Sequence, residues 1–374
     1  MKTYGIDANV LTREKRTGTE RYVFELLKEM MKIPLREDEK VLLYTSKSLS
    51  DFQELPTGWE ERILKWKLPT LWTHLRLSWE LFRRTPDVFF SPAHEIPLIH
   101  GRTKIVSTVH DVAFARLKHV YSSKSRKRQQ WAVRRATRLA QHLLTVSQTT
   151  KQDLSQLYSV KSEKMTVTHL AVDRNSFQID REEVDRVLQK YRLGEGTYFL
   201  SIGRIEKKKN IETLISAFEQ LKIRRGVGDA SKLVLAGSFG FGEEEIKQKI
   251  VTSPARDFIV ITNYLPQEDL PGLMRGALSY VFPSYYEGFG IPTLEAMAAD
   301  VPVIASDIPT LREIAADAAI FVSPHHAPQW TQAMLDIWLK KIRVEDLIEK
   351  GRKRVGEFDW SKTAQKTWEV LRKV

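Results

Sequence analysis

The sequence predicts an α/β protein built from two doubly wound domains. Short apolar runs typical of buried parallel strands alternate with stretches whose apolar residues recur at helical spacing. This alternation occurs twice along the 374 residues, a length that commonly corresponds to two domains. In the second half, two of the runs lead into a glycine, Gly203 and Gly237. Ligands of such sheets bind beyond the carboxyl ends of the strands, so the loops after the runs are the expected place for a site.

The first domain is expected over residues 1–176. Its strands are predicted at 4–7, 41–44, 88–90, 105–109 and 143–146. Its helices are predicted at 21–31, 122–142 and 147–158. In the first of these helices, Tyr22, Val23, Leu26, Leu27, Met30 and Met31 recur at helical spacing.

The second domain is expected over residues 177–358, after a junction near 174–180. Its strands are predicted at 198–202, 232–236, 258–261, 277–282 and 301–305, and its helices at 211–221, 243–251, 267–275 and 293–299. The last segment, residues 359–374, predicts a separate amphipathic helix, with Ser361 as the expected N-cap.

The excess of positive charge belongs to the first half of the chain. Residues 1–176 contain 31 Lys and Arg against 19 Asp and Glu, whereas residues 177–374 contain 28 against 28. A basic stretch at 124–138 surrounds Trp131. Such a surface suits an anionic membrane, although a solvated helix face beside core tryptophans gives the same pattern. Nucleic acid is not expected as a partner, because no nucleic-acid-binding motif is present and the second half is balanced in charge.

Composition also restricts the chemistry and the location. The chain has no cysteine, which excludes disulfides, zinc–thiolate sites and cysteine nucleophiles. No apolar run approaches the roughly 18 residues of a membrane-spanning helix, and the first residues lack the features of a signal peptide. We therefore expect a cytoplasmic protein, held at the inner face of the cell membrane if the basic half binds lipid.

One stretch, residues 284–298, combines acidic side chains with a glycine turn. Glu287 and Glu295 lie eight residues apart around Gly288, Phe289 and Gly290, and a helix is expected to start near Pro292 or Thr293. Carboxylates accept hydrogen bonds from sugar hydroxyls, and a helix N-terminus presents free amides to a diphosphate. A tight turn with two ordinary glutamates is the alternative. The Ala-Met-Ala that follows, and Pro302 to Ser306, favour the ligand site.

A second stretch, residues 201–210, supplies cations. Arg204 and Lys209 lie five residues apart, after Gly203 at a predicted strand-to-helix junction. Arginine binds phosphate oxygens bidentately, and lysine provides a mobile positive charge. Fixed cations at this place would stabilise the negative charge that grows on a departing diphosphate. A basic surface loop is the alternative reading.

Together these two stretches resemble the donor site of retaining glycosyltransferases of family 4, which have the GT-B fold. The resemblance is close over about residues 198–323 and looser before them. It implies two Rossmann-like domains facing a central cleft, with residues 359–374 crossing back onto the N-terminal domain. It also implies transfer without a metal ion or other cofactor, and the chain has no Asp-x-Asp motif. One departure is Asp300, where the family usually has glycine.

The resemblance assigns roles to individual residues. Arg204 and Lys209 would contact the donor phosphates, Glu287 the transferred sugar and Glu295 the ribose of a nucleotide-sugar donor. The rest of the donor site would comprise Gly203, Gly288, Phe289, Gly290, Thr293 and Leu294. The base would be read by the loop at 263–265.

Five residues of the first domain complete the expected site. His110 stands at the end of a predicted strand and is expected beside the sugar as a catalytic residue, or else as a hydrogen-bonded loop histidine. Its neighbour Asp111, together with His94, Arg21 and Gly18, is expected to contact acceptor or phosphate. For the region of Gly18 and Arg21 the alternative is an ordinary helix start capped by Thr17 or Thr19. No helical His-x-x-x-His spacing supports a metal site.

The expected function is transfer of a hexose with retention of configuration. The Ser91-Pro-Ala-His-Glu segment is typical of mannosyl- and rhamnosyltransferases, so GDP-mannose is the first donor expected, with a dTDP- or UDP-sugar as the alternative. The acceptor would be a lipid-linked or polysaccharide precursor in cell-surface glycan assembly. Two other functions stay open: another GT-B enzyme, such as a UDP-sugar epimerase or a phosphorylase, and a non-catalytic scaffold that keeps the fold.

Overall fold

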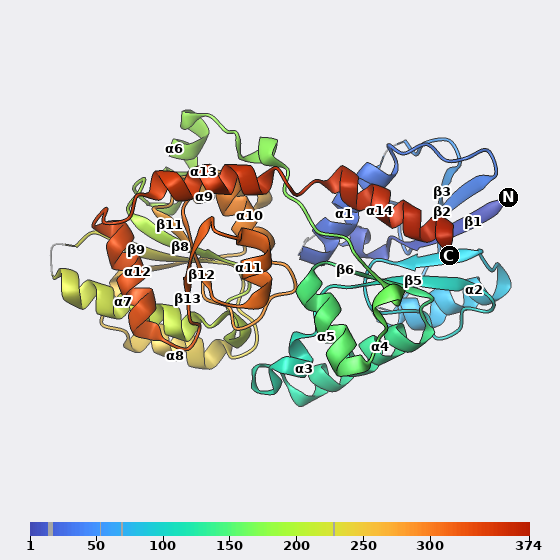
Figure 1. The fold of residues 1–374 in the computed structure, drawn as a ribbon, viewed down its shortest axis with the longest axis horizontal. Coiled ribbons are helices and arrows are strands. Elements are labelled where there is room, and N and C mark those ends of the chain that lie inside the picture. Colours follow the sequence, from blue (N-terminus) through green and yellow to red (C-terminus); the bar gives the residue numbers. More distant parts are fainter. Residues whose placement is uncertain (14–17, 53, 69, 227–228) are drawn as a thin grey trace. The chain divides into compact units, whose positions relative to one another are not determined.

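The chain forms two compact units (Figure 1). A computed structural model describes residues 1–13, 18–52, 54–68, 70–226 and 229–374. Unit 1 comprises residues 1–115, 123–170 and 359–374, and unit 2 comprises residues 116–122 and 171–358. The main boundary therefore falls at Leu170, before the expected junction, and the short segment 116–122 joins unit 2.

Unit 1 is built on a seven-stranded parallel sheet with the order β3-β2-β1-β4-β5-β6-β7. Its strands are β1 (Lys2–Asp7), β2 (Glu39–Thr45), β3 (Trp59–Ile63), β4 (Val88–Ser91), β5 (Lys104–Val109), β6 (His142–Thr145) and β7 (Met165–Val167). The strand order reverses between β1 and β4, which lie side by side in the sheet. Their carboxyl ends, at Asp7 and Ser91, mark the switch point at which such sheets bind ligands.

Six α-helices in the described part of the chain belong wholly or mainly to unit 1. They are α1 (Gly18–Met30), α2 (Ser78–Arg83), α3 (Ala113–Arg116), α4 (Ser123–Leu139), α5 (Gln148–Tyr158) and α14 (Trp360–Lys373). The last helix, α14, packs against α1 (Figure 1). The expectation that Ser361 caps this helix is wrong, because the carboxylate of Asp359 is the N-cap and accepts the Ser361 N–H at 2.7 Å. Aspartate is a strong N-cap residue that also favours the positive end of the helix dipole.

Unit 2 contains a six-stranded parallel sheet with the order β10-β9-β8-β11-β12-β13. Its strands are β8 (Tyr198–Ile202), β9 (Lys232–Ala236), β10 (Ile259–Asn263), β11 (Ser279–Phe282), β12 (Val303–Ser306) and β13 (Ala319–Val322). Its helices are α6 (Arg181–Tyr191), α7 (Ile211–Arg225), α8 (Glu243–Thr252), α9 (Leu270–Arg275), α10 (Ile291–Ala298), α11 (Pro309–Ala315), α12 (Ala327–Trp338) and α13 (Val344–Val355). Here the strand order reverses between β8 and β11.

Helices cover both faces of the unit 2 sheet (Figure 1). Helices α7, α8 and α12 share one apolar core with the sheet, in which Trp330 and Phe218 are fully buried. On the other face, α10 contacts α13 and α6 contacts α9. Burying both faces explains why the central strands of this unit are nearly continuous apolar runs.

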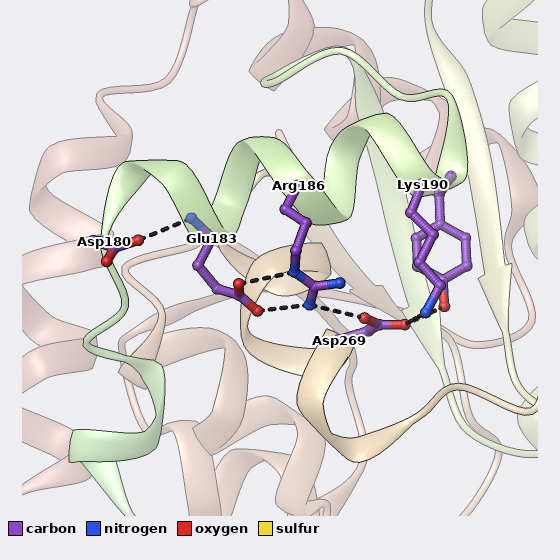
Figure 2. Close-up of polar contacts among 6 residues, drawn as sticks. Asp180, Glu183, Arg186, Lys190 and Asp269 are labelled. Atoms are coloured by element: carbon purple, nitrogen blue, oxygen red, sulfur yellow. Dashed lines mark hydrogen bonds and ion pairs between the residues drawn. The ribbon is translucent and has the colours of Figure 1, made fainter.

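A polar cluster joins α6 to the start of α9 (Figure 2). The side chain of Asp269 is fully buried and accepts hydrogen bonds from Lys190, from Tyr191 at 2.8 Å and from Arg186 at 3.3 Å. Arg186 also forms two hydrogen bonds with Glu183. Burial alone would raise the pKa of Asp269, but the hydrogen bonds from Lys190, Tyr191 and Arg186 hold it below the usual value.

Asp300, where the family usually has glycine, lies after α10. It has a φ of 61°, in the left-handed region that glycine adopts most easily. Its carboxylate forms two hydrogen bonds with Arg352 of α13, at 2.7 and 2.9 Å. Asp300 therefore adopts a left-handed turn conformation that glycine would also allow, and it forms an ion pair at the surface of unit 2.

Candidate functional site

The two motifs of unit 2 meet at the strand-order reversal. Gly203 and Arg204 follow β8, and the loop that carries Glu287 follows β11, the neighbouring strand. The ammonium of Lys209 lies 2.6 Å from a carboxylate oxygen of Glu287, and only 16% and 9% of these side chains are exposed. The ammonium also lies 4.9 Å from the centre of the Phe282 ring. The structure thus brings together a cation and a carboxylate that stand far apart in the sequence.

Hydrogen bonds tie the two loops of this site together. The Tyr285 N–H donates to the Lys208 carbonyl at 3.0 Å. The side-chain amide of Asn210 donates to the carbonyls of Pro283 at 3.1 Å and Pro324 at 2.7 Å. Thr310 on α11 donates to the Glu287 carbonyl at 2.8 Å. The positions of Lys209 and Glu287 are therefore fixed by neighbouring backbone as well as by their mutual attraction.

A close approach of two glycines shapes the loop after β8. A Cβ at Gly237, which follows β9, would lie 1.9 Å from the Gly203 carbonyl oxygen, and Gly237 has a φ of 144°. Only glycine fits there. Arg204, the next residue after Gly203, has a side chain that is 66% exposed and lies 3.8 Å from Glu206. Its guanidinium is accessible to a ligand.

Helix α10 begins at the same edge of the sheet. Gly290 precedes it with a φ of 94°, and a Cβ there would lie 2.7 Å from Leu311. The helix starts at Ile291, slightly before the expected position. Gly288, Phe289, Thr293, Leu294 and Glu295 are all buried. Phe289 packs edge-on against Phe358 at 5.7 Å, so its side chain supports the turn and its contribution to a ligand would come from its backbone.

Three buried hydroxyls lie close to these elements in the sequence of unit 2. In the described part of the chain, the side-chain oxygens of Ser284, Thr293 and Ser306 have no hydrogen-bond partner. Ser284 follows β11, Thr293 is in the first turn of α10, and Ser306 ends β12. Unpaired buried hydroxyls are costly, and they fit a polar ligand that would pair with them. Sequence reasoning missed Ser284 and Ser306, although Ser284 begins and Ser306 ends a stretch that it used.

The histidine predicted in unit 1 follows β5. The Nε2 atom of His110 lies 2.8 Å from the Pro92 carbonyl, which can only accept, so Nε2 carries the proton. Burial lowers the pKa of His110 to about 4, and the hydrogen bond to Pro92 opposes the shift. The ring packs edge-on against Tyr22 of α1 at 4.8 Å. His110 is therefore a neutral, oriented side chain near pH 7.

An acidic residue that sequence reasoning missed ends β1. Asp7 is buried, and burial raises its pKa to about 7 despite the hydrogen bond that it accepts from the Asn9 N–H at 3.1 Å. The charge of Glu95 acts in the same direction as burial. A strongly shifted carboxyl at a strand-order reversal is typical of a functional site. The sequence feature that could have indicated Asp7 is its position at the end of the first predicted strand.

The other predicted residues of unit 1 have less distinctive surroundings. His94 is close enough to Asp111 and Glu95 for their charges to act on it, while burial lowers its pKa. Asp111 accepts the Ala113 N–H at 3.0 Å and so caps a turn. Gly18 is the first residue of α1, and a Cβ there would meet nothing within 4 Å, so the protein itself does not require a glycine. Arg21 lies in the same helix and is partly exposed, while Thr17 lies outside the described residues.

The predicted residues thus fall into two groups. Gly203, Arg204, Lys209, Glu287 and the α10 residues belong to unit 2, whereas Gly18, Arg21, His94, His110 and Asp111 belong to unit 1. Over the described ranges, no three His, Asp or Glu side chains are arranged to hold a metal ion. Within the same ranges, no helix is both long and apolar enough to cross a bilayer.

Both halves of the chain match known families. The family described as Glycosyltransferase Family 4 matches residues 16–176, and the family described as Glycosyl transferases group 1 matches residues 183–354. Among relatives, the chain is 27% identical over 368 residues to O-antigen chain mannosyltransferase B of Escherichia coli, which covers 94% of each chain. It is also 27% identical over 304 residues to O-antigen chain mannosyltransferase RfbU of Salmonella typhimurium, covering 81% of this chain and 78% of the relative.

Solved structures share the fold of this chain. HepE from Anabaena, in complex with UDP and glucose, has a TM-score of 0.77 at 17% identity and covers 100% of both chains. WaaG, a glycosyltransferase involved in lipopolysaccharide biosynthesis, has a TM-score of 0.74 at 17% identity and covers 99% of both chains. At such low identity these likenesses establish the fold, which is that of GT-B glycosyltransferases. The two family matches, together with the donor-type motifs at the β8/β11 reversal, show that the chain belongs to glycosyltransferase family 4.

Proposed function

We propose that the protein transfers a hexose from a nucleoside-diphosphate sugar to a glycan acceptor with retention of configuration. The observation that carries this proposal is the Lys209–Glu287 pair, 2.6 Å apart at the strand-order reversal of unit 2. A cation and a carboxylate held side by side suit a ligand in which a phosphate adjoins a sugar. Arg204 follows β8, and the three unpaired hydroxyls lie after β11, in the first turn of α10 and at the end of β12.

Each residue has a chemical role in the proposed reaction. The bond between the anomeric carbon and the diphosphate oxygen breaks, and the acceptor oxygen bonds to the same face of that carbon. Arg204 and Lys209 stabilise the charge that develops on the departing diphosphate. The acceptor proton passes to that diphosphate. Glu287 accepts hydrogen bonds from the sugar, and Glu295 from the ribose.

We further propose that no metal ion takes part. Two cations and the N-terminus of α10 would supply the positive charge that a metal supplies in other transferases. His110 would orient the sugar as a neutral hydrogen-bonding group, which its lowered pKa supports.

The relatives favour mannose as the transferred sugar. The two O-antigen relatives are mannosyltransferases, which supports GDP-mannose as donor and a lipid-linked or polysaccharide acceptor in cell-surface glycan assembly. HepE binds UDP in its solved structure, which keeps a UDP-sugar as the alternative.

Calorimetric titration with GDP, UDP and dTDP, each with and without magnesium, tests this proposal. We expect tight binding of one nucleotide, with the same affinity in the absence of the metal. Binding that requires magnesium would contradict the metal-independent route, and binding of none would contradict the donor site itself.

Replacement of the central lysine tests the catalytic role. Lys209→Ala should lower kcat about 100- to 1000-fold, the usual effect of removing a group that stabilises transition-state charge. Lys341→Ala, which removes the same charge from an exposed position of unit 2, is the matched control. Unchanged turnover in Lys209→Ala would contradict the role of this lysine.

We also propose that unit 1 contacts an anionic membrane, through an apolar patch beside its basic residues. The patch comprises Leu75, Trp79, Phe82, Leu98, Ile99 and Trp131, which are between 41% and 60% exposed. Neighbouring contacts connect its parts: the Ile99 N–H donates to Ser78 at 3.2 Å, and Arg135 contacts both the Leu98 carbonyl and the Trp131 ring. Aromatic and aliphatic side chains flanked by arginines are typical of surfaces that bind anionic lipid.

Sedimentation with vesicles of phosphatidylglycerol tests the membrane contact. Trp79→Ala combined with Phe82→Ala should reduce binding at least about tenfold, because two exposed aromatic groups no longer enter the bilayer surface. Ile223→Ala removes an apolar side chain that is 62% exposed in unit 2 and should leave binding unchanged. An equal loss in both variants would contradict the patch.

A further inference from the structure

A polar pocket lies in unit 1, formed in part by the basic stretch 124–138. It has a volume of about 510 Å³, and its lining includes Arg134, Thr137, Arg138, Tyr158, Lys161 and Lys164. This volume is in the range of sites that hold small organic ligands. None of these residues belongs to the predicted donor or acceptor site.

The pocket lies at the opposite edge of the sheet from Asp7 and His110. Arg134 and Arg138 are near the end of α4, which precedes β6, and Lys161 and Lys164 precede β7. In a parallel sheet, residues that precede strands lie at the amino edge, whereas Asp7 and His110 follow strands and lie at the carboxyl edge. The pocket is therefore separate from the reaction site of this unit.

The charged residues that line the pocket are all positive. Four cations line it, and no carboxylate does. Within the described parts of the chain, none of these four cations forms an ion pair with Asp or Glu. The Lys164 ammonium donates to the Thr137 carbonyl at 2.9 Å, and burial lowers its pKa. Lys164 is half-buried and the other three cations are exposed. Like charges held together repel one another unless an anion joins them.

A tyrosine hydroxyl in the same pocket also has an unsatisfied hydrogen bond. The Tyr158 oxygen is buried and has no partner among the described residues. Burial raises the pKa of Tyr158, and the charge of the nearby Arg134 opposes that rise. A neutral hydroxyl beside a guanidinium can donate to an oxygen of the anion that the guanidinium binds.

We propose that this pocket binds a phosphate ester of about the size of a sugar phosphate. Arg134 and Arg138 would grip phosphate oxygens bidentately, Lys161 and Lys164 would add point charges, and the Tyr158 hydroxyl would complete the set. The site is distinct from the donor diphosphate site of unit 2 and does not depend on the function proposed for it.

Calorimetric titration with inorganic pyrophosphate tests the pocket in the full chain. All variants carry Arg204→Ala and Lys209→Ala, which remove the phosphate-binding cations proposed in unit 2. Adding Arg134→Gln and Arg138→Gln should weaken binding about 10- to 100-fold, because charge-assisted hydrogen bonds are lost. Tyr158→Phe should weaken it less, by about threefold to tenfold. Lys127→Gln, an exposed position of the same helix outside the pocket, should leave binding unchanged.

Vesicles distinguish the two sources of such a phosphate. If a lipid headgroup supplies it, Arg134→Gln with Arg138→Gln lowers sedimentation with phosphatidylglycerol vesicles, and pyrophosphate competes with them. If a soluble ester supplies it, sedimentation stays the same while pyrophosphate binding falls. Absence of pyrophosphate binding, or an equal loss in Lys127→Gln, would overturn the proposal. Thermal unfolding of each variant confirms that it is folded.

Discussion

At the residue scale, Gly237 occupies a place where no side chain fits. A Cβ there would meet the Gly203 carbonyl oxygen at 1.9 Å, so Gly237→Ala must displace the loop that carries Arg204. We expect unit 2 to lose at least about 3 kcal/mol of stability, since a clash adds to the strain of a positive φ. Gly196→Ala is the matched control, because Gly196 has a φ of 64° but an added Cβ would meet nothing within 4 Å. Thermal unfolding with and without nucleotide measures both effects.

The buried carboxyl of Asp7 predicts a specific dependence of stability on pH. Its pKa is about 7 in the folded protein against 3.8 ordinarily. The folded state thus holds the proton more tightly, so the contribution of Asp7 to stability is greatest below pH 4 and falls as the pH rises to about 7. The full loss is roughly 4 kcal/mol, at about 1.4 kcal/mol for each tenfold change in proton affinity.

Asp7→Asn should therefore gain stability relative to the natural chain as the pH rises from 4 to 7. Denaturant unfolding at a series of pH values measures the difference. Asp38→Asn, the same substitution at an exposed position of unit 1, controls for the general effect of removing a negative charge. A difference between Asp7→Asn and the natural chain that is independent of pH would contradict the raised pKa.

Individual residues were predictable where a motif gave their spacing. Lys209 and Glu287 could be selected because each belongs to a short pattern with recognisable chemistry. Asp7 and Ser306 could not, because each is a common residue type at the end of a strand, and its importance depends on which strands are neighbours. That information comes from the sheet order, which no local pattern contains.

At the element scale, Asp269 connects two helices of unit 2 (Figure 2). Asp269→Ala should destabilise this unit by about 1–3 kcal/mol, less than for a fully buried pair because Arg186 and Lys190 are nearly half exposed. Since the pKa of Asp269 is lowered, its contribution is present above about pH 4 and is lost as the pH falls further.

Glu183→Gln provides the matched control for this cluster. Glu183 contacts the same Arg186 but lies at the surface, so its replacement should destabilise the unit much less than Asp269→Ala does. Chemical denaturation at pH 7 compares the two variants. Equal destabilisation would mean that burial of Asp269 does not determine the strength of the cluster.

The central strands were predictable as elements, and so was the edge strand β10, whereas β3, β7 and β13 were not predicted. β8 and β9 have the predicted bounds, because a strand buried on both faces is a continuous apolar run. β3 has the sequence Trp-Glu-Glu-Arg-Ile and lies at the edge of its sheet. Because three of its residues are charged, it lacks the apolar run that predicts a strand. Helix α6 was not predicted, although its sequence has the features of a helix N-terminus: Asp180 caps it, and Glu182 and Glu183 occupy its first turn.

At the scale of the whole molecule, helix α14 completes unit 1. The Trp368 side chain is 1% exposed, packs against the rings of Tyr4 and Trp59 and donates to the Met30 carbonyl at 3.2 Å. Arg372 forms a two-pronged ion pair with Glu39, at 3.0 and 2.7 Å. The unit therefore contains sequence from both ends of the described chain.

Removal of the central side chain of α14 tests its contribution. Trp368→Ala should destabilise unit 1 by about 3–5 kcal/mol through the cavity that it leaves. Lys366→Ala, at an exposed position of the same helix, should have almost no effect. Calorimetry of the full chain should show the loss in one of two unfolding transitions. A loss shared equally by both transitions would contradict the assignment of α14 to unit 1.

The discontinuity of unit 1 has a consequence for synthesis on the ribosome. Residues 171–358 form most of unit 2 as one uninterrupted segment, so that unit has nearly all of its sequence before α14 is translated. The first half of the chain emerges earlier, but its core is incomplete until Trp368 has been translated. Until then, the surfaces of Tyr4 and Trp59 that Trp368 covers are exposed. Most of unit 1 is thus translated before unit 2 but completed after it, and its uncovered apolar surface stays exposed for longer.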